Sequence, residues 1–166
     1  KIDNGSTVWG NSGITAMVGL DGDIKYTSRF RKGENDFFLT WEDNRSAKRI
    51  YGTRITENSV LYQDGKQLSY SDNSSDEIAL PIVIKDDNNF FVGTYDATST
   101  PKYLRINKLD ESFENLWDSV GVAISSEADM RNAKLVSIGS GVGCFWSESR
   151  LWDNNIYFQY LDNEGN

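Results

Sequence analysis

An internal repeat with a period of roughly 50 residues is the feature that most limits what this chain can fold into. Three segments resemble one another: residues 35–69, 89–125 and 141–166. In this alignment Trp41, Tyr95 and Trp146 share one position, at spacings of 54 and 51 residues. A repeat of this length indicates one supersecondary unit that buries its apolar faces by packing on its neighbours.

Aliphatic positions align in the same register as the aromatic ones. The aligned sets are Ile50, Leu104 and Ile156, followed by Ile55, Leu109 and Leu161. A polar turn comes next and leads to Tyr62 in the first unit and to Trp117 in the second. Residues 1–15 resemble the end of a unit, which the third copy lacks. The sequence therefore predicts a single domain, residues 1–166, with units at approximately 16–69, 70–125 and 126–166, the last completed by residues 1–15.

Side-chain alternation within the repeat predicts short strands that are covered on both sides. In the segment DFFLTW, Phe37, Leu39 and Trp41 point to one side, while Phe38 and Thr40 point to the other. Both sides are largely apolar, which is typical of a strand between two layers. Each unit holds three such strands and a more polar fourth. We therefore predict an all-β fold, a β-propeller-like array of four-stranded antiparallel blades with about three repeats of 51–55 residues. A β-sandwich or another β-repeat array is the alternative.

The segments TWEDNR, RIYGTRI, FWSESR and NIYFQYLDNEGN resemble the repeats of secreted bacterial β-propeller proteins, particularly large surface proteins exported by the type IX secretion system. The turn DNGSTVW is more distantly similar to the Asp-box of sialidase-like propellers. The middle unit departs from the pattern, because Tyr95 replaces a tryptophan and no arginine stands where Arg45 and Arg150 do. The resemblance implies a secreted bacterial protein, extracellular or displayed on the cell surface.

The charge balance and the missing histidines exclude several classes of function. The chain has 25 Asp and Glu residues against 17 Lys and Arg, a formal net charge of −8, and no His. An acidic surface repels phosphate backbones, so nucleic acid is not an expected partner. Ser-His-Asp triads and the common zinc sites need His. The one cysteine, Cys144, is interpreted as a half-buried strand thiol, and no apolar run approaches the roughly 18 residues of a membrane span.

Aromatic and charged residues near the end of the second strand are the candidate ligand contacts. The aligned aromatic residues could form a platform for a sugar ring, or they could pack between blades, which the repetition favours. The arginines follow acidic residues closely, so they either hold the adjacent turn by charge-assisted bonds or contact an anion or carbohydrate. The eight candidates are Trp41, Tyr95, Trp146, Arg45, Arg150, Glu42, Asp43 and Glu148.

No catalytic residues and no cofactor are predicted. The Asp-rich segments GLDGDIK, KDDNNFF and LWDNNIY offer oxygen ligands, which leaves calcium as an alternative, but none has the full pattern of an EF-hand loop. Asp and Glu are plentiful, yet the sequence does not place two of them at a glycosidase separation.

The sequence thus favours an extracellular binding or adhesion module that recognises a protein or glycan through blade-face loops, without catalysis. The alternatives are a carbohydrate-active enzyme, such as a sialidase-like glycoside hydrolase, its ancillary propeller, or a propeller lectin. Apart from its ligand, the chain is expected to contact further blades of the same chain or a second copy. If the ring closes within this chain, residues 8–15 should pair with residues 156–161.

Overall fold

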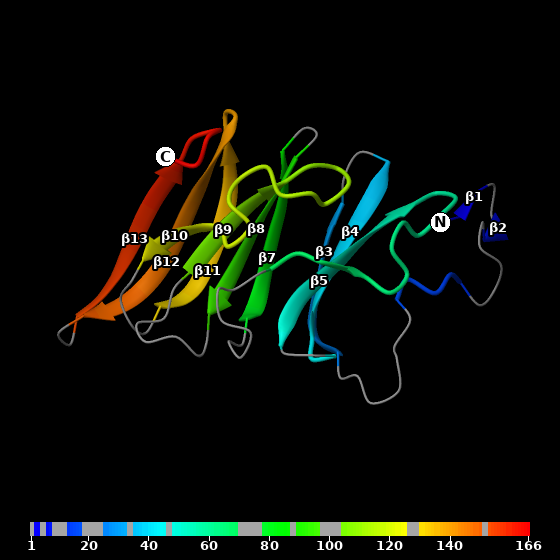
Figure 1. Cartoon of the computed structure of the whole chain (residues 1–166), viewed down its shortest axis with the longest axis horizontal. Coiled ribbons are helices and arrows are strands. Elements are labelled where there is room, and N and C mark those ends of the chain that lie inside the picture. Colours follow the sequence, from blue (N-terminus) through cyan, green and yellow to red (C-terminus); the bar gives the residue numbers. More distant parts are fainter. Residues whose placement is uncertain are drawn as a thin grey trace.

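The structure of this chain is a computed structural model. It describes residues 2–3, 6–7, 13–17, 25–32, 35–45, 48–69, 78–86, 89–96, 104–125, 130–150 and 153–166. All regular elements in these residues are β-strands, and every strand pair is antiparallel (Figure 1). The all-β class predicted from the sequence is confirmed.

Three sheets follow one another along the chain, and each is a meander in which consecutive strands are hydrogen-bonded neighbours. The first sheet contains β3 (Lys25–Lys32), β4 (Asp36–Asp43), β5 (Arg49–Thr56) and β6 (Lys66–Gln67). The middle sheet contains β7 (Ile78–Asp86), β8 (Asn89–Asp96), β9 (Leu104–Leu109) and β10 (Val122–Ser125). The last sheet contains β11 (Met130–Ile138), β12 (Gly141–Arg150) and β13 (Asp153–Leu161). A ribbon of β1 (Ile2–Asp3) and β2 (Ser6–Thr7) precedes them.

The three sheets lie side by side along the long axis of the molecule, with the last sheet at the left of Figure 1 and the first toward the right. Two separate apolar cores fill the spaces between them. The core between the first and middle sheets consists of Phe38, Ile50, Leu68, Phe90, Val92, Leu109 and Phe113. The core between the middle and last sheets consists of Ile84, Phe91, Leu104, Ile106, Met130, Leu135, Val142, Cys144, Trp146 and Leu161.

Phe90 and Phe91 show why the middle sheet is buried on both faces. They are adjacent in β8, and successive residues of a strand point to opposite faces, so they enter different cores. The middle sheet therefore holds the other two in place.

Strand register gives a structural alignment of the three sheets. The equivalent pairs between the second and third strands are Phe37 with Ile55, Phe90 with Leu109, and Val142 with Leu161. The aliphatic positions of the third strand thus align as the sequence predicted. Below, two residues are called equivalent when they occupy the same place in this register.

The aromatic alignment is wrong by one residue in the middle sheet. The equivalent pairs four residues further along the second strand are Trp41 with Tyr51, Thr94 with Arg105, and Trp146 with Tyr157. Tyr95 instead pairs with Leu104 and packs beside the core shared with the last sheet. A shift of one residue turns a side chain to the opposite face of its sheet, so Tyr95 and the two tryptophans point to opposite sides of their sheets.

The completion of the third unit by residues 1–15 stays a prediction. Most of the predicted pairing of residues 8–15 with residues 156–161 falls outside the described residues. In the part of the chain that is described, β13 has β12 as its hydrogen-bonded neighbour. That part also has no helix long and apolar enough to cross a membrane.

Candidate functional site

Trp41 is fully buried near the end of β4, where a carboxylate of the same strand holds its indole. Trp41 Nε1 donates a hydrogen bond to Asp43 Oδ2 over 3.1 Å. Arg45 binds the same carboxylate, with its guanidinium at 2.6 Å and its backbone N–H at 3.0 Å. Its guanidinium also lies over the Tyr51 ring, 4.2 Å from the centroid. Arg45 therefore ties the turn after β4 to the strand by a charge-assisted bond. This is the first of the two interpretations that the sequence allowed for Arg45.

The last sheet repeats this arrangement with a different acid. Trp146 Nε1 donates to Glu148 Oε2 over 2.9 Å, and both side chains are buried. The Tyr157 ring stacks on the indole at a centroid distance of 5.7 Å. A carboxylate two residues after the tryptophan satisfies an indole N–H that would otherwise be buried without a partner. The middle sheet has Thr94 at the position of these tryptophans, so it has no indole N–H there that needs an acceptor.

In the structure these aromatic residues do not form a platform, which was the less favoured of the two interpretations of their alignment. Trp41 and Trp146 are buried, so neither presents a ring face on which a sugar could stack. Tyr95 is half-buried on the opposite face of its own sheet, and Glu42 is buried in β4. The structure does not bring the three aromatic residues to one surface. The side chain of Arg150 lies outside the described part of the structure.

Cys144 is buried in the core between the middle and last sheets. Burial raises the pKa of its thiol to about 12. A thiol with this pKa stays protonated at neutral pH, and the thiolate is the reactive form. Cys144 is therefore a packing residue.

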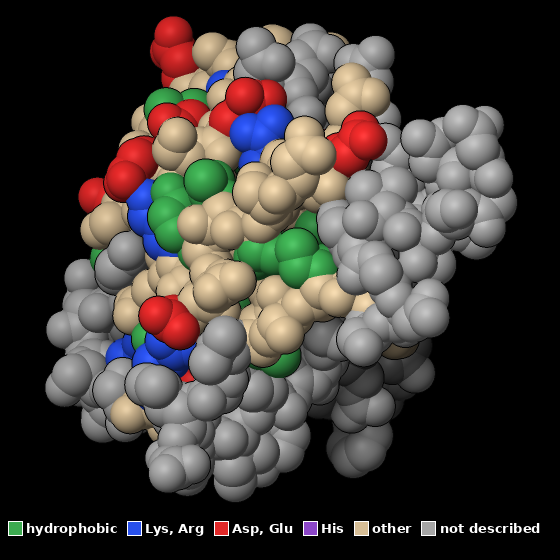
Figure 2. Space-filling model, turned by 90° about the vertical axis from the view of Figure 1, so that its right-hand side faces the viewer, with side chains coloured by type: hydrophobic (Ala, Val, Ile, Leu, Met, Phe, Trp, Pro, Cys, Tyr) green, Lys and Arg blue, Asp and Glu red, His purple; other side chains and the backbone are tan. Residues whose placement is uncertain are grey.

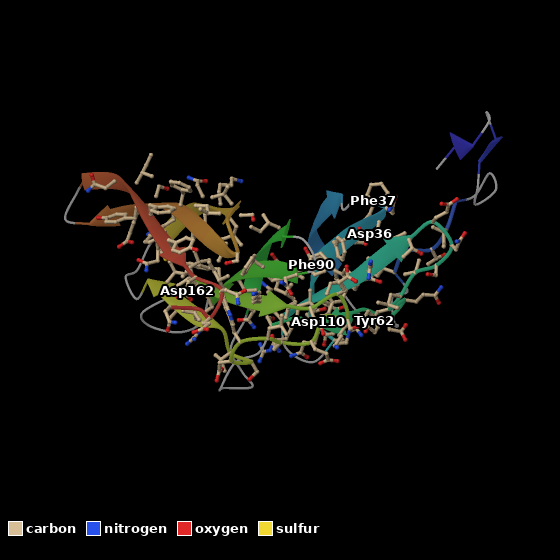
Figure 3. All side chains as sticks on the ribbon, turned by 90° about the horizontal axis from the view of Figure 1, so that it is seen from above. Asp36, Phe37, Tyr62, Phe90, Asp110 and Asp162 are labelled. Atoms are coloured by element: carbon tan, nitrogen blue, oxygen red, sulfur yellow. The ribbon has the colours of Figure 1, made fainter. Side chains whose placement is uncertain are left out.

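A loop follows the third strand of each sheet, and the three loops, predicted from the sequence as polar turns, form a continuous surface. They are residues 57–65, 110–121 and 162–166, called the loop edge below. Figure 3 shows Tyr62, Asp110 and Asp162 in a row along one side of the ribbon. Each of the three sheets therefore contributes one loop to this edge.

Asp110 and Asp162 are equivalent, and each folds its own loop. Asp110 Oδ1 accepts the backbone N–H groups of Ser112 and Glu114. Asp162 Oδ1 accepts those of Glu164 and Asn166 in the same way. The backbone hydrogen bonds from Asn166 and Glu164 lower the pKa of Asp162 below its usual value. Both aspartates therefore hold their loops through side-chain-to-backbone hydrogen bonds. The segments GLDGDIK, KDDNNFF and LWDNNIY, to which the calcium alternative refers, lie partly outside the described residues.

The second and third loops are each tied to the loop before them by an aromatic side chain. Tyr62 Oη donates to the backbone oxygen of Ser112 over 3.0 Å. Trp117 Nε1 donates to the backbone oxygen of Asn163 over 3.0 Å. The aromatic residue after the polar turn, which the sequence aligned, therefore holds the next loop of the array.

Cations at equivalent positions of β5 and β9 strengthen these ties. Arg54 contacts Asp36 at 2.7 Å in its own sheet and reaches Glu111 of the next loop at 3.5 Å. Lys108, equivalent to Arg54, donates to Asn163, which is equivalent to Glu111. The sequence offered no signal for this role, because nothing in a single strand shows which loop its cation will reach.

One apolar side chain stands exposed at the same place on two of these loops. Leu61 is 47% exposed and Leu116 is 50% exposed, and each precedes the aromatic residue that ties its neighbour. Their backbone N–H groups donate to the equivalent carbonyl oxygens of Arg54 and Lys108, both over 2.8 Å. Fixed backbones therefore hold both leucines outward.

The three loops of the edge contain no Lys or Arg of their own, although Arg54 and Lys66 of the first sheet pair with Glu111 and Glu114. The acidic residues of the loop edge are Glu57, Asp64, Asp110, Glu111, Glu114, Asp118, Asp162 and Glu164. Across the described ranges, no group of three or more His, Cys, Asp or Glu side chains is placed to hold a metal ion. The arrangement is suited to contact with a cationic surface that also carries apolar groups.

No protein-family model and no curated protein matches this chain. Among solved structures, the chain is similar to a candidate glycoside hydrolase from Bacteroides ovatus ATCC 8483, at 12% sequence identity and a TM-score of 0.42. The match covers 84% of this chain and 50% of that one, so the chain spans half the length of this neighbour. A likeness this distant assigns no activity.

Proposed function

We propose that this chain is a run of consecutive β-propeller blades that acts as an extracellular binding module, without catalysis, and that it engages a protein through the loop edge. The observation that carries the proposal is the pair of exposed leucines at equivalent places on loops that are fixed to the neighbouring sheets. The extracellular location is supported by the resemblance to repeats of secreted surface proteins.

The repeated contacts at successive sheet boundaries support consecutive blades. In a propeller each sheet turns the same face to the next one. Phe38 and Phe91 are equivalent, and each enters the core shared with the following sheet. Tyr62 and Trp117 likewise each reach the loop of the following sheet. The repeated ties are what a blade array requires.

The chemistry of the loop edge supports a protein partner. Leu61 and Leu116 are held by backbone hydrogen bonds, so little conformational freedom is lost when they are covered. The surrounding acidic groups and the net charge of −8 favour a partner that presents Lys or Arg beside apolar side chains. Trp41 and Trp146 are buried and offer no stacking surface, which makes a glycan the weaker choice.

Panning a phage-displayed library of random peptides on the chain tests this function. The enriched peptides should combine Lys or Arg with an aliphatic residue, and they should bind more weakly as salt rises. Replacing both leucines, Leu61→Ser with Leu116→Ser, should lower the affinity by roughly tenfold or more. The matched control is Gln159→Ser, an exposed position on β13, which should bind as the unaltered chain does.

Two results would overturn the proposal. Strong hits on a glycan array that survive the paired leucine change would favour the lectin alternative. Turnover of a fluorogenic glycoside, lost on changing a single Glu or Asp, would establish the enzyme alternative.

A further inference from the structure

The face of the last sheet that points away from the middle sheet is largely apolar and open, with Lys134 beside Phe145 at one side. Six large hydrophobic side chains are exposed on it: Val136, Ile138, Phe145, Ile156, Phe158 and Tyr160. Phe145 and Phe158 contact each other, with ring centroids 4.6 Å apart. Gly143 lies among them, since a Cβ added there would meet Ile138, Phe158 and Val136. The patch is continuous over all three strands and exposes on the order of 500 Å² of apolar surface, near the upper end for a monomer.

Register shows what this face corresponds to in the middle sheet. Ile156 and Phe158 are equivalent to Leu104 and Ile106. Leu104 and Ile106 are fully buried against the last sheet, whereas Ile156 is 81% exposed and Phe158 is 48% exposed. The open face is therefore a sheet-packing face on which no described sheet is packed.

The opposite end of the molecule carries the matching half of such a contact. Phe37 is 43% exposed on the face of the first sheet that points away from the middle sheet. Its equivalents, Phe90 and Val142, are fully buried against the preceding sheet. Figure 2 looks onto this end and shows hydrophobic side chains open to solvent. Trp41 on the same face is already covered, so the open part lies around Phe37.

We propose that the open face of the last sheet receives the Phe37 side of the first sheet of a second copy, head to tail, and that two copies close into a ring. This inference rests on the proposed arrangement of the sheets as consecutive blades. Head-to-tail contacts form rings when the rotation closes. In the described residues, two copies supply six sheets of three or four strands, within the roughly four to eight blades of known propellers.

The residues on the two faces fit this pairing. The patch on the last sheet provides over half of the about 800 Å² that each partner buries in a stable complex. Among the described residues of the facing side, Phe37 supplies an exposed apolar side chain. Tyr160 is equivalent to Arg54 and Lys108, the residues that reach the loop of the following sheet. In the head-to-tail contact its hydroxyl meets the loop of the second copy that begins at Glu57.

Sedimentation velocity with the whole chain tests the proposal. The unaltered chain should sediment as a dimer. The double change Ile156→Lys with Phe158→Lys should give a monomer, and Phe37→Lys should do so independently. Both sites are exposed, and circular dichroism would verify that each variant is folded. Leu61→Ser and Leu116→Ser should leave the dimer intact, which separates this contact from the proposed loop function.

Mixing the two monomeric variants distinguishes head-to-tail pairing from other dimers. Each variant keeps the half of the contact that the other lacks, so the mixture should form dimers again, more weakly because one contact is made instead of two. A monomeric unaltered chain at high micromolar concentration would overturn the proposal. A dimer that Phe37→Lys leaves unchanged would also overturn it, as would a ladder of longer polymers.

Discussion

The two packed boundaries between the sheets share one geometry but differ in chemistry. In the first boundary, between the first and middle sheets, the Phe38 and Phe90 rings contact each other in a tilted arrangement with centroids 3.7 Å apart. The second boundary, between the middle and last sheets, is mostly aliphatic and includes Cys144. In both, a cation sits over the equivalent phenylalanine: Arg54 over Phe38 at 5.8 Å, and Lys108 over Phe91 at 5.7 Å.

Equivalent positions of the repeat therefore make the same contacts with different residue types. Arg54 reaches the carboxylate of Glu111, while Lys108 reaches the neutral Asn163 in the equivalent loop. Tyr62 and Trp117 use different donor atoms for the same backbone contact. Each boundary can therefore be weakened separately, and the changes below are ordered by their expected effect.

Breaking the aromatic core should have the largest effect. Phe90→Ala removes a ring that contacts both Phe38 and Phe113, so it should lower the free energy of unfolding by about 3–5 kcal/mol. Urea unfolding measures the loss. Ile106→Ala is the matched change in the second boundary, with about 2–5 kcal/mol expected. A loss below about 1 kcal/mol for Phe90→Ala would mean that the first boundary is not packed as described.

The two equivalent cations should respond differently to the same change. Arg54→Met leaves Asp36 buried without its cation, and Asp36 Oδ1 already has no hydrogen-bond partner, so about 1–3 kcal/mol should be lost. Lys108→Met replaces a buried cation whose hydrogen bonds go to the neutral Asn163, and should cost less than about 1 kcal/mol. The same urea series measures both. Equal losses would contradict the ionic difference between the boundaries.

The aromatic ties to the loops should contribute less. Tyr62→Phe removes only the hydroxyl that donates to Ser112, with about 1 kcal/mol expected. Trp117→Phe also loses part of a ring that packs on Phe91, so its effect should be somewhat larger. Thermal unfolding compares the two. If both variants melt with the unaltered chain, the loop edge is not held by these bonds.

Asp162 should give the smallest effect, confined to acid pH. The backbone N–H groups of Asn166 and Glu164 lower its pKa in the folded state, so its carboxylate contributes stability above its usual pKa. That contribution is lost as pH falls through the lower folded value. Stability of Asp162→Asn should therefore change less with pH in this window. A pH series of urea midpoints measures the difference, and identical curves would contradict it.

Much of the fold could be predicted because the apolar residues of the three units keep the same spacing along the sequence. Ile50 and Ile55 in the first unit, with their counterparts in the other two, lie at equivalent places on the third strands. Tyr95 could not be placed, because residue type alone does not reveal a slip of one residue, and such a slip changes the face. The completion of the last sheet by residues 1–15 stays a prediction.

The candidate site was harder to predict than the fold. Whether Trp41 faces solvent depends on what covers it, and a sequence shows only that Asp43 follows two residues later. The contacts of Lys66 with Ser112 and Glu114 join residues far apart in the chain. Such contacts form only when whole sheets pack together, so no local sequence pattern predicts them.

The most direct test is a nuclear Overhauser spectrum of the aromatic side chains in solution. In the structure the middle sheet separates two cores, with Phe90 in one and Phe91 in the other. We expect cross-peaks from Phe90 to Phe38 and Phe113, and from Phe91 to Trp117. Cross-peaks that join Phe91 to Phe38, with none between Phe90 and Phe38, would contradict the order of the sheets.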